Sequence, residues 1–277
     1  MNGSFLELMR FLAAPFVMCL ILAGIHCYLG IHVLARGVIF VDLSLAQIAA
    51  LGSTIALLLG CEHHSTGAYF VSLGCTFIAA ALFALARRHE KQFSQEAIIG
   101  ITYALGSAAV ILVVDHMAHG AEHIKDLLVG NILWVTWKDV LKVACIYSAV
   151  GILHYIFRKP ILAVSFESET KVQPKNSGLW DFVFYALFGI VITSSVSVAG
   201  VLQVFAYLIV PAVVGNLFFA TVRGRLYFGW ALGFVLSLLA MILSAKWDLP
   251  SGAFIVVCFT ALPILLLVTG GGRWARR

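Results

Sequence analysis

Residues 182–222 form a run of 41 residues that contains no charged side chain. As one straight helix this run would be about 60 Å long, twice the ~30 Å hydrocarbon core of a bilayer. We therefore expect it to hold two membrane spans that fold back near residues 194–200. Seven other apolar runs have the length of one span each: 11–34, 38–60, 68–86, 97–114, 140–157, 226–245 and 249–269.

Composition leads to the same class of protein. The chain is 62% hydrophobic and 11% charged, whereas soluble domains have about 45–50% apolar and about 25% charged residues. This excludes soluble enzymes and nucleic-acid-binding modules. The longest polar stretch, residues 158–181, is too short for a folded extramembrane domain. We predict an all-α, polytopic membrane helical bundle of about eight or nine transmembrane helices, with residues 1–277 as a single transmembrane domain in the lipid bilayer.

Lysine and arginine residues in the connectors predict the orientation. Thirteen of them fall on one side, at Arg36 and in the segments 87–91, 158–175, 223–225 and 273–277, against five on the other side. Because positive residues concentrate on the cytoplasmic side, we expect the amino terminus outside and the carboxyl terminus in the cytoplasm. The six cysteines lie mostly inside apolar runs without CxxC spacing, which is typical of small buried side chains.

Two connectors on the predicted outer side contain an unusual number of metal-ligand side chains. Five of the nine histidines lie in residues 61–64 and 115–123, together with three carboxylates. If residues 116–123 are helical, His116, His119 and His123 share one face with Glu122 beside them. Imidazole and carboxylate groups suit zinc, manganese and iron. A solvated polar loop is the alternative.

Asp42 is the one carboxylate well inside an apolar run, and Gln47 follows five residues later. A charged group at the centre of a membrane helix costs roughly 2.5–3.5 kcal/mol on insertion scales, so such residues usually face a cavity or a partner. We predict a functional role inside the membrane for both residues. Because Asp42 is near the predicted cytoplasmic end of its span, reaching the headgroups or capping the helix is the alternative.

The sequence contains no phosphate-binding loop, since the dipeptide Gly-Lys does not occur in it. No nucleophile–base pair stands out, which predicts a transporter rather than an enzyme. The polar loop at residues 161–178 carries Glu167 and Glu169 near its start. A short helix there could dock on a cytoplasmic partner, and an ordinary solvated connector is the alternative.

Several segments, in order along nearly the whole chain, resemble the integral-membrane permeases of zinc, manganese and iron ABC transporters. The matching segments are RGVIFVDLSLAQIAALG (36–52), EAIIGITYALGSA (96–108), HGAEHIKDLLVGNILWV (119–135), LAVSFESE (162–169), VAGVLQVFAYLIVPA (198–212) and DLPSGAFIVV (248–257).

The resemblance implies a homodimeric permease in the bacterial inner membrane, formed with a second copy of the chain. It also implies a cytoplasmic ABC ATPase subunit and an extracytoplasmic metal-binding protein that delivers the cation. The metal is the transported substrate, and we expect no permanently bound cofactor. The VSFESE segment matches the family's coupling segment, which implies that Glu167 and Glu169 dock on the ATPase.

The sequence departs from the family pattern in two places. Lys171, Pro174 and the late Gly178 interrupt the Ala-xxx-Gly that usually follows the coupling segment. Many relatives carry Gly-Asp-x-x-x-His in the second span, and the Asp and His of this motif lie on the cation path. The resemblance therefore implies that Asp42 contacts the cation, whereas Ala46 or Gln47 takes the position of the histidine, depending on the alignment. The missing imidazole implies a differently built intramembrane site, for which the outer histidines could compensate by collecting the cation.

Three alternatives are open on the sequence alone. The chain could be an ABC permease for a metal chelate or another small solute, or an ATP-independent secondary transporter. A membrane enzyme is the third alternative, without positive support.

Overall fold

Apolar helices build the part of the chain that this computed structural model describes, residues 2–62, 65–115, 117, 120–166 and 176–269. Eight of these helices are long and apolar enough to cross a bilayer, which confirms the predicted all-α membrane bundle. They are α1 (Asn2–Arg36), α2 (Val41–Leu58), α3 (Thr66–Arg88), α4 (Gln95–Val114), α6 (Trp137–Ile156), α9 (Ser177–Phe218), α10 (Val222–Trp247) and α11 (Ser251–Val268).

Three shorter elements connect these helices: α5 (Gly120–Val129), the 3₁₀ turn η1 (Ile132–Trp134) and α7 (Arg158–Ser165). At 1.5 Å per residue, α5 is about 15 Å long, half the thickness of a bilayer core. Helix α5 is therefore too short to cross a bilayer.

The charge-free run predicted to form two spans lies in the 42-residue helix α9, which is broken at one residue. Gly200 has φ 75° and ψ 164°, a conformation that only glycine adopts without strain. The break falls at the end of the predicted 194–200 region. The break divides α9 into two segments, but α9 counts as one of the eight candidate spans in the described residues, where the sequence predicted two.

The chain divides into two compact units. Unit 1 contains Met1–Ile31, Val129–Tyr147 and Val198–Arg277, and unit 2 contains His32–Leu128 and Ser148–Ser197. The helices α1, α6 and α9 each contribute one part to unit 1 and the other part to unit 2. In α9 the division lies next to the break at Gly200.

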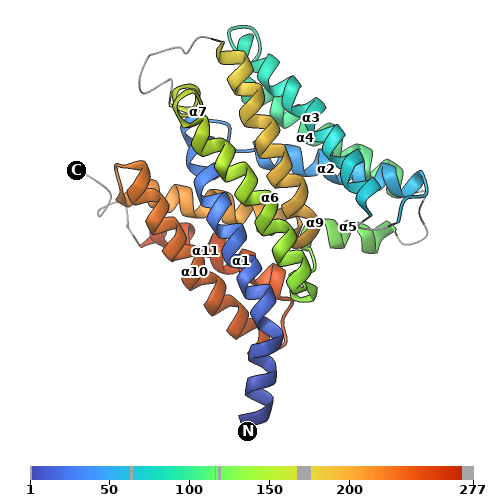
Figure 1. Cartoon of the computed structure of the whole chain (residues 1–277), viewed down its shortest axis with the longest axis vertical. Coiled ribbons are helices and arrows are strands. Elements are labelled where there is room, and N and C mark those ends of the chain that lie inside the picture. Colours follow the sequence, from blue (N-terminus) through green and yellow to red (C-terminus); the bar gives the residue numbers. More distant parts are fainter. Residues whose placement is uncertain (1, 63–64, 116, 118–119, 167–175, 270–277) are drawn as a thin grey trace. The chain divides into compact units, whose positions relative to one another are not determined.

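In unit 2, helix α2 packs closely against both α3 and α4 (Figure 1). A Cβ atom added at Gly52 would lie 2.6 Å from the Cα of Ser72, so only glycine permits this approach of α2 and α3. The Ser72 hydroxyl donates to the Ala49 carbonyl over 2.9 Å at the same contact. Small residues and a hydroxyl at the contact are typical of helix packing in membranes.

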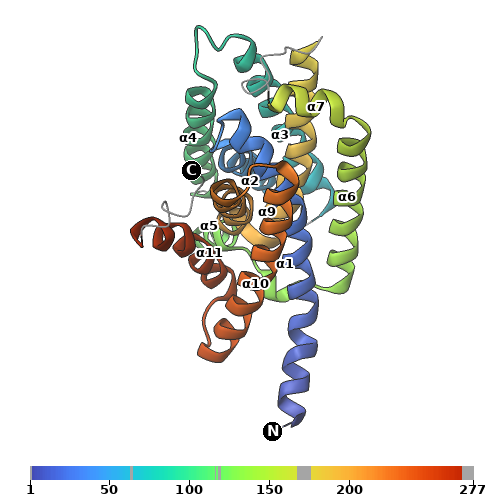
Figure 2. The ribbon, with the colours of Figure 1, turned by 90° about the vertical axis from the view of Figure 1, so that its left-hand side faces the viewer.

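In unit 1, backbone contacts join segments that are far apart in the sequence. Gly30 of α1 lies directly against the carbonyl of Leu208 in the second segment of α9. Gly130, with φ 68°, packs in the same way against the backbone of Ala199. Helix α10 packs against α11 (Figure 2), and the Tyr207 hydroxyl is 2.7 Å from that of Ser237 in α10.

Candidate functional site

Asp42 lies in the first turn of α2 and is 1% exposed. Neither of its carboxylate oxygens has a side-chain hydrogen-bond partner among the described residues, and the same holds for the buried hydroxyl of Ser44. Backbone amide groups of Asp42 and Leu43 interact with its charge, and burying a carboxylate without a side-chain partner is costly. Asp42 is therefore a candidate for contact with a cation.

A second carboxylate, which the sequence analysis did not single out, lies close to the start of α2. Glu96, in the first turn of α4, accepts a hydrogen bond from the amide of Phe40 through Oε1, over 3.3 Å. Its Oε2 is buried and has no partner in the described part of the chain. The charge of Glu96 also acts on Asp42. Glu96 is only partly buried, and its negative charge adds to that of Asp42 near the start of α2.

Gln47 lies on a different face of α2 from Asp42. Five residues correspond to about 140° around a helix axis, so the two predicted path residues do not form one ligand face on α2. Gln47 is 8% exposed, and its Cβ would be 3.2 Å from a Cβ added at Gly106 of α4. Ser107, which follows Gly106 in α4, has a buried hydroxyl without a partner among the described residues.

The contact between Gln47 and Gly106 gives a test of this region. We expect Gly106→Leu to lower transport strongly, because the larger side chain would push α4 away from α2. This would change the position of Glu96, at the start of α4, relative to Asp42, at the start of α2. The measurement is substrate uptake normalised to the amount of protein in the membrane. Gly100→Leu is the matched control, because a Cβ at Gly100 of the same helix meets no atom within 4 Å. Equal effects of the two variants would contradict the prediction.

The outer histidines lie largely outside the described residues. This applies to His116, to His119 and to the side chain of His123. Of the stretch 116–123 in which we expected a helix, the described residues are Met117, which lies in a bend, and residues 120–123, which belong to α5. The side chain of Glu122 is exposed. Within the described ranges, no three His, Cys, Asp or Glu side chains are grouped to hold a metal ion.

Glu167 and Glu169, the predicted ATPase contacts, also lie outside the described residues. The structure describes what precedes them. Helix α7 ends at Ser165, directly before this segment, and its residues Ile161 and Val164 are fully buried.

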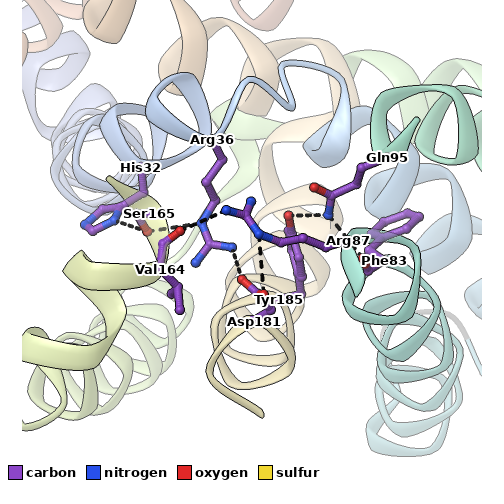
Figure 3. A network of polar contacts seen from close by, with 9 residues as sticks. All are labelled: His32, Arg36, Phe83, Arg87, Gln95, Val164, Ser165, Asp181 and Tyr185. Atoms are coloured by element: carbon purple, nitrogen blue, oxygen red, sulfur yellow. Dashed lines mark hydrogen bonds and ion pairs between the residues drawn. The ribbon is translucent and has the colours of Figure 1, made fainter. Parts of the chain in front are cut away.

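A buried polar cluster surrounds the end of α7 in unit 2 (Figure 3). Asp181 of α9 binds two arginines, with 2.8 Å from its Oδ1 to Nη1 of Arg36 and 3.4 Å from its Oδ2 to Nε of Arg87. The Nε of Arg36 also donates to the Ser165 hydroxyl over 3.1 Å, and that hydroxyl is 2.8 Å from Nδ1 of His32. We call these five residues the Asp181 cluster.

Sequence reasoning missed this cluster because its charged members stand at the ends of apolar runs. Arg36 and Arg87 are typical of the positive residues that flank the cytoplasmic ends of spans, and Asp181 closes the longest polar stretch. Their separation along the chain gives no signal that they meet.

Comparisons with known proteins agree with the sequence resemblance. Residues 8–270 match the family model of the ABC 3 transport family. The "Chelated iron transport system membrane protein YfeC" of Yersinia pestis is 24% identical over 93% of this chain and 86% of its own length. The "Manganese transport system membrane protein MntC" of Halalkalibacterium halodurans is 22% identical over 87% of this chain and 82% of its own.

The fold also has a close counterpart among solved structures. A chain of PsaBC from Streptococcus pneumoniae, solved in complex with Fab, superposes with a TM-score of 0.77 at 19% identity, over 96% of this chain and 95% of that one. This likeness concerns the arrangement of the helices. The family match covers nearly all of the sequence, and the chain therefore belongs to the ABC 3 transport family.

Proposed function

We propose that the chain is the permease subunit of an ABC importer and forms the translocation path for a divalent transition-metal cation: zinc, manganese or ferrous iron. The observation that carries this proposal is the buried carboxylate of Asp42, which has no side-chain hydrogen-bond partner among the described residues. Carboxylate oxygens can replace part of a cation's hydration shell, and a site built from few ligands binds weakly enough for release.

The energy source in this proposal is a separate ATPase subunit. The sequence has no phosphate-binding loop, and the membrane proteins named above support an ABC importer in which hydrolysis takes place on another chain. We place the ATPase contact at residues 162–178, with Glu167 and Glu169 as docking residues. Two copies of the permease form the path in a bacterial inner membrane, with the amino terminus outside and the carboxyl terminus in the cytoplasm.

On the outer side, a metal-binding protein docks near residues 115–135 and releases its cation. The side chains of His116, His119, Glu122 and His123 then collect the cation at the entrance. Below the entrance, Asp42 and Gln47 contact the cation from different faces of α2. Cycles of ATP binding and hydrolysis alternate access to this path between the two sides of the membrane.

The proposal is tested by total cell metal, measured by mass spectrometry in a deletion strain with and without the restored gene. We expect one of zinc, manganese or iron to fall in the deletion strain and to recover with the wild-type gene. Uptake should stop when cellular ATP is depleted while the membrane potential is maintained. Uptake that follows the potential instead would indicate a secondary transporter. Loss of only a chelated form of the metal would identify a chelate permease.

The role of the outer histidines has its own expected result. Replacing His116, His119 and His123 together by alanine should raise the metal concentration that gives half-maximal uptake, with little change in the maximal rate, because collection at the entrance matters only when the metal is scarce. The measurement is uptake against metal concentration. His89→Ala, at the end of α3, is the control, and an unchanged curve for the triple variant would exclude the collecting role.

A further inference from the structure

The Asp181 cluster joins four helices at one buried point (Figure 3). Arg36 and His32 come from the end of α1, Arg87 from the end of α3, Ser165 from the end of α7 and Asp181 from the first turns of α9. The side chains of Arg36 and Asp181 are 0% and 3% exposed, and that of Arg87 is 15% exposed. The guanidinium carbon of Arg36 also lies 3.9 Å from the centre of the Phe184 ring.

The two arginines hold the last turn of α7 at consecutive residues. Arg36 donates to the hydroxyl of Ser165, and Arg87 donates from Nη2 to the carbonyl of Val164 over 3.1 Å. The same two guanidinium groups bind the two carboxylate oxygens of Asp181. The end of α7 is therefore connected to α1 and α3 directly, and to α9 through either arginine.

The charges in this cluster make the connection stiff. Separating a buried carboxylate from a buried guanidinium leaves uncompensated charges in a low dielectric. A displacement of α7 is thus more favourable when α1, α3 and α9 move with it than when the ion pairs break. If the Asp181 cluster only held the helices together, apolar side chains of similar volume would often stabilise the fold as much as the buried ion pairs do.

We propose that the Asp181 cluster transmits displacement of α7 to α1, α3 and α9 during ATP-driven transport. Ser165 and the carbonyl of Val164 receive the movement, and Asp181 joins the two arginines so that the helices respond together. This inference rests on the proposed function, because the source of the movement is an ATPase docked on the segment after α7. Arg36, Arg87, Ser165 and Asp181 are positioning residues in this scheme, without contact to the cation.

The test uses the complete transporter, permease with its ATPase subunit, reconstituted in liposomes and supplied with the metal found in the uptake experiment. For each variant, the number of ATP molecules hydrolysed per ion transported is measured together with the thermal unfolding temperature. We expect Asp181→Asn and Ser165→Ala to keep hydrolysing ATP while transport falls. The ratio should rise by roughly 5- to 150-fold, the range of ordinary coupling free energies.

Two further variants of the cluster and two controls complete the design. Asp181→Glu keeps the charge and should restore most of the coupling. Arg87→Gln should add little to the effect of Asp181→Asn, because both act on one interaction. Asp139→Asn, in the first turn of α6, and Ser148→Ala, exposed on α6, repeat the same chemical changes outside the cluster and should leave the ratio unchanged.

Each result bears on one of the two proposals. A wild-type transporter that moves no metal with ATP overturns the proposed function. A wild-type transporter that works, with unchanged ratios in Asp181→Asn and Ser165→Ala, overturns the coupling role. The coupling role is also overturned if transport and hydrolysis fall in proportion as the unfolding temperature falls. If Asp181→Asn does not assemble, Ser165→Ala decides, since it leaves every charge in place.

Discussion

Replacing Asp42 by asparagine is expected to reduce metal uptake while leaving the protein at least as stable as the wild type. Uptake should fall at least about tenfold, because a unit charge near a cation contributes about 1.4 kcal/mol or more even in partly screened surroundings. Stability should be maintained or rise, because a buried carboxylate without a side-chain partner opposes folding. Uptake of the metal in the restored deletion strain and the thermal unfolding temperature of the purified variant measure these two effects.

The opposite signs of these effects distinguish a transport role from a structural one. If Asp42 caps its helix, the asparagine variant should keep its uptake, since asparagine caps helices as well as aspartate does. If Asp42 holds the fold together, uptake and unfolding temperature should fall together. Asp139→Asn, made in the first turn of α6, is the matched control for uptake and should leave uptake unchanged. Its unfolding temperature should fall slightly, because the Asp139 carboxylate accepts hydrogen bonds from Thr136. Full uptake in the Asp42→Asn variant would place the intramembrane site elsewhere.

The second large effect is expected at Gly30. Gly30→Ala should remove most of the folded protein, because the new methyl group would overlap the Leu208 carbonyl, a backbone group that cannot rotate away. We expect the free energy of unfolding to fall by about 3 kcal/mol or more, at the upper end of what overpacking costs. The yield of monodisperse protein after detergent extraction and its thermal unfolding temperature are the measurements.

A neighbouring glycine of the same helix provides the control. A Cβ at Gly24 meets no atom within 4 Å, so Gly24→Ala should leave the protein intact and gain up to about 1 kcal/mol of helix propensity. A yield of Gly30→Ala equal to that of Gly24→Ala would contradict the close approach of α1 and α9 at Leu208.

Most of the secondary structure follows from hydrophobic length alone, because a bilayer requires each span to be apolar over a fixed distance. The 41-residue run 182–222 predicted the position of a break correctly. It could not predict the residue, because three serines and one glycine in 194–200 could each end a helix. What the structure adds is the conformation of Gly200.

The site was only partly predictable. Asp42 could be predicted because placing a charged group inside a membrane span costs free energy, so a lone carboxylate in an apolar run indicates a functional role. Glu96 was missed because an acidic residue in the first turn of a helix is ordinarily explained by the helix dipole. The pairing of Asp181 with Arg36 and Arg87 depends on contacts across more than ninety residues, which no local pattern encodes.

Because segments of the two units alternate along the sequence, the units become complete at different times during synthesis on the ribosome. Unit 2 needs no residue beyond Ser197, whereas unit 1 combines the first 31 residues with segments that extend to the end of the chain. Because synthesis proceeds at about 5–20 residues per second, the 178 residues between Gly30 and Leu208 take about 9–36 seconds to synthesise. During that interval the surface of α1 that contains Gly30 is open to lipid or to an insertase, and truncated chains that end before Leu208 should be recognised and degraded as incomplete.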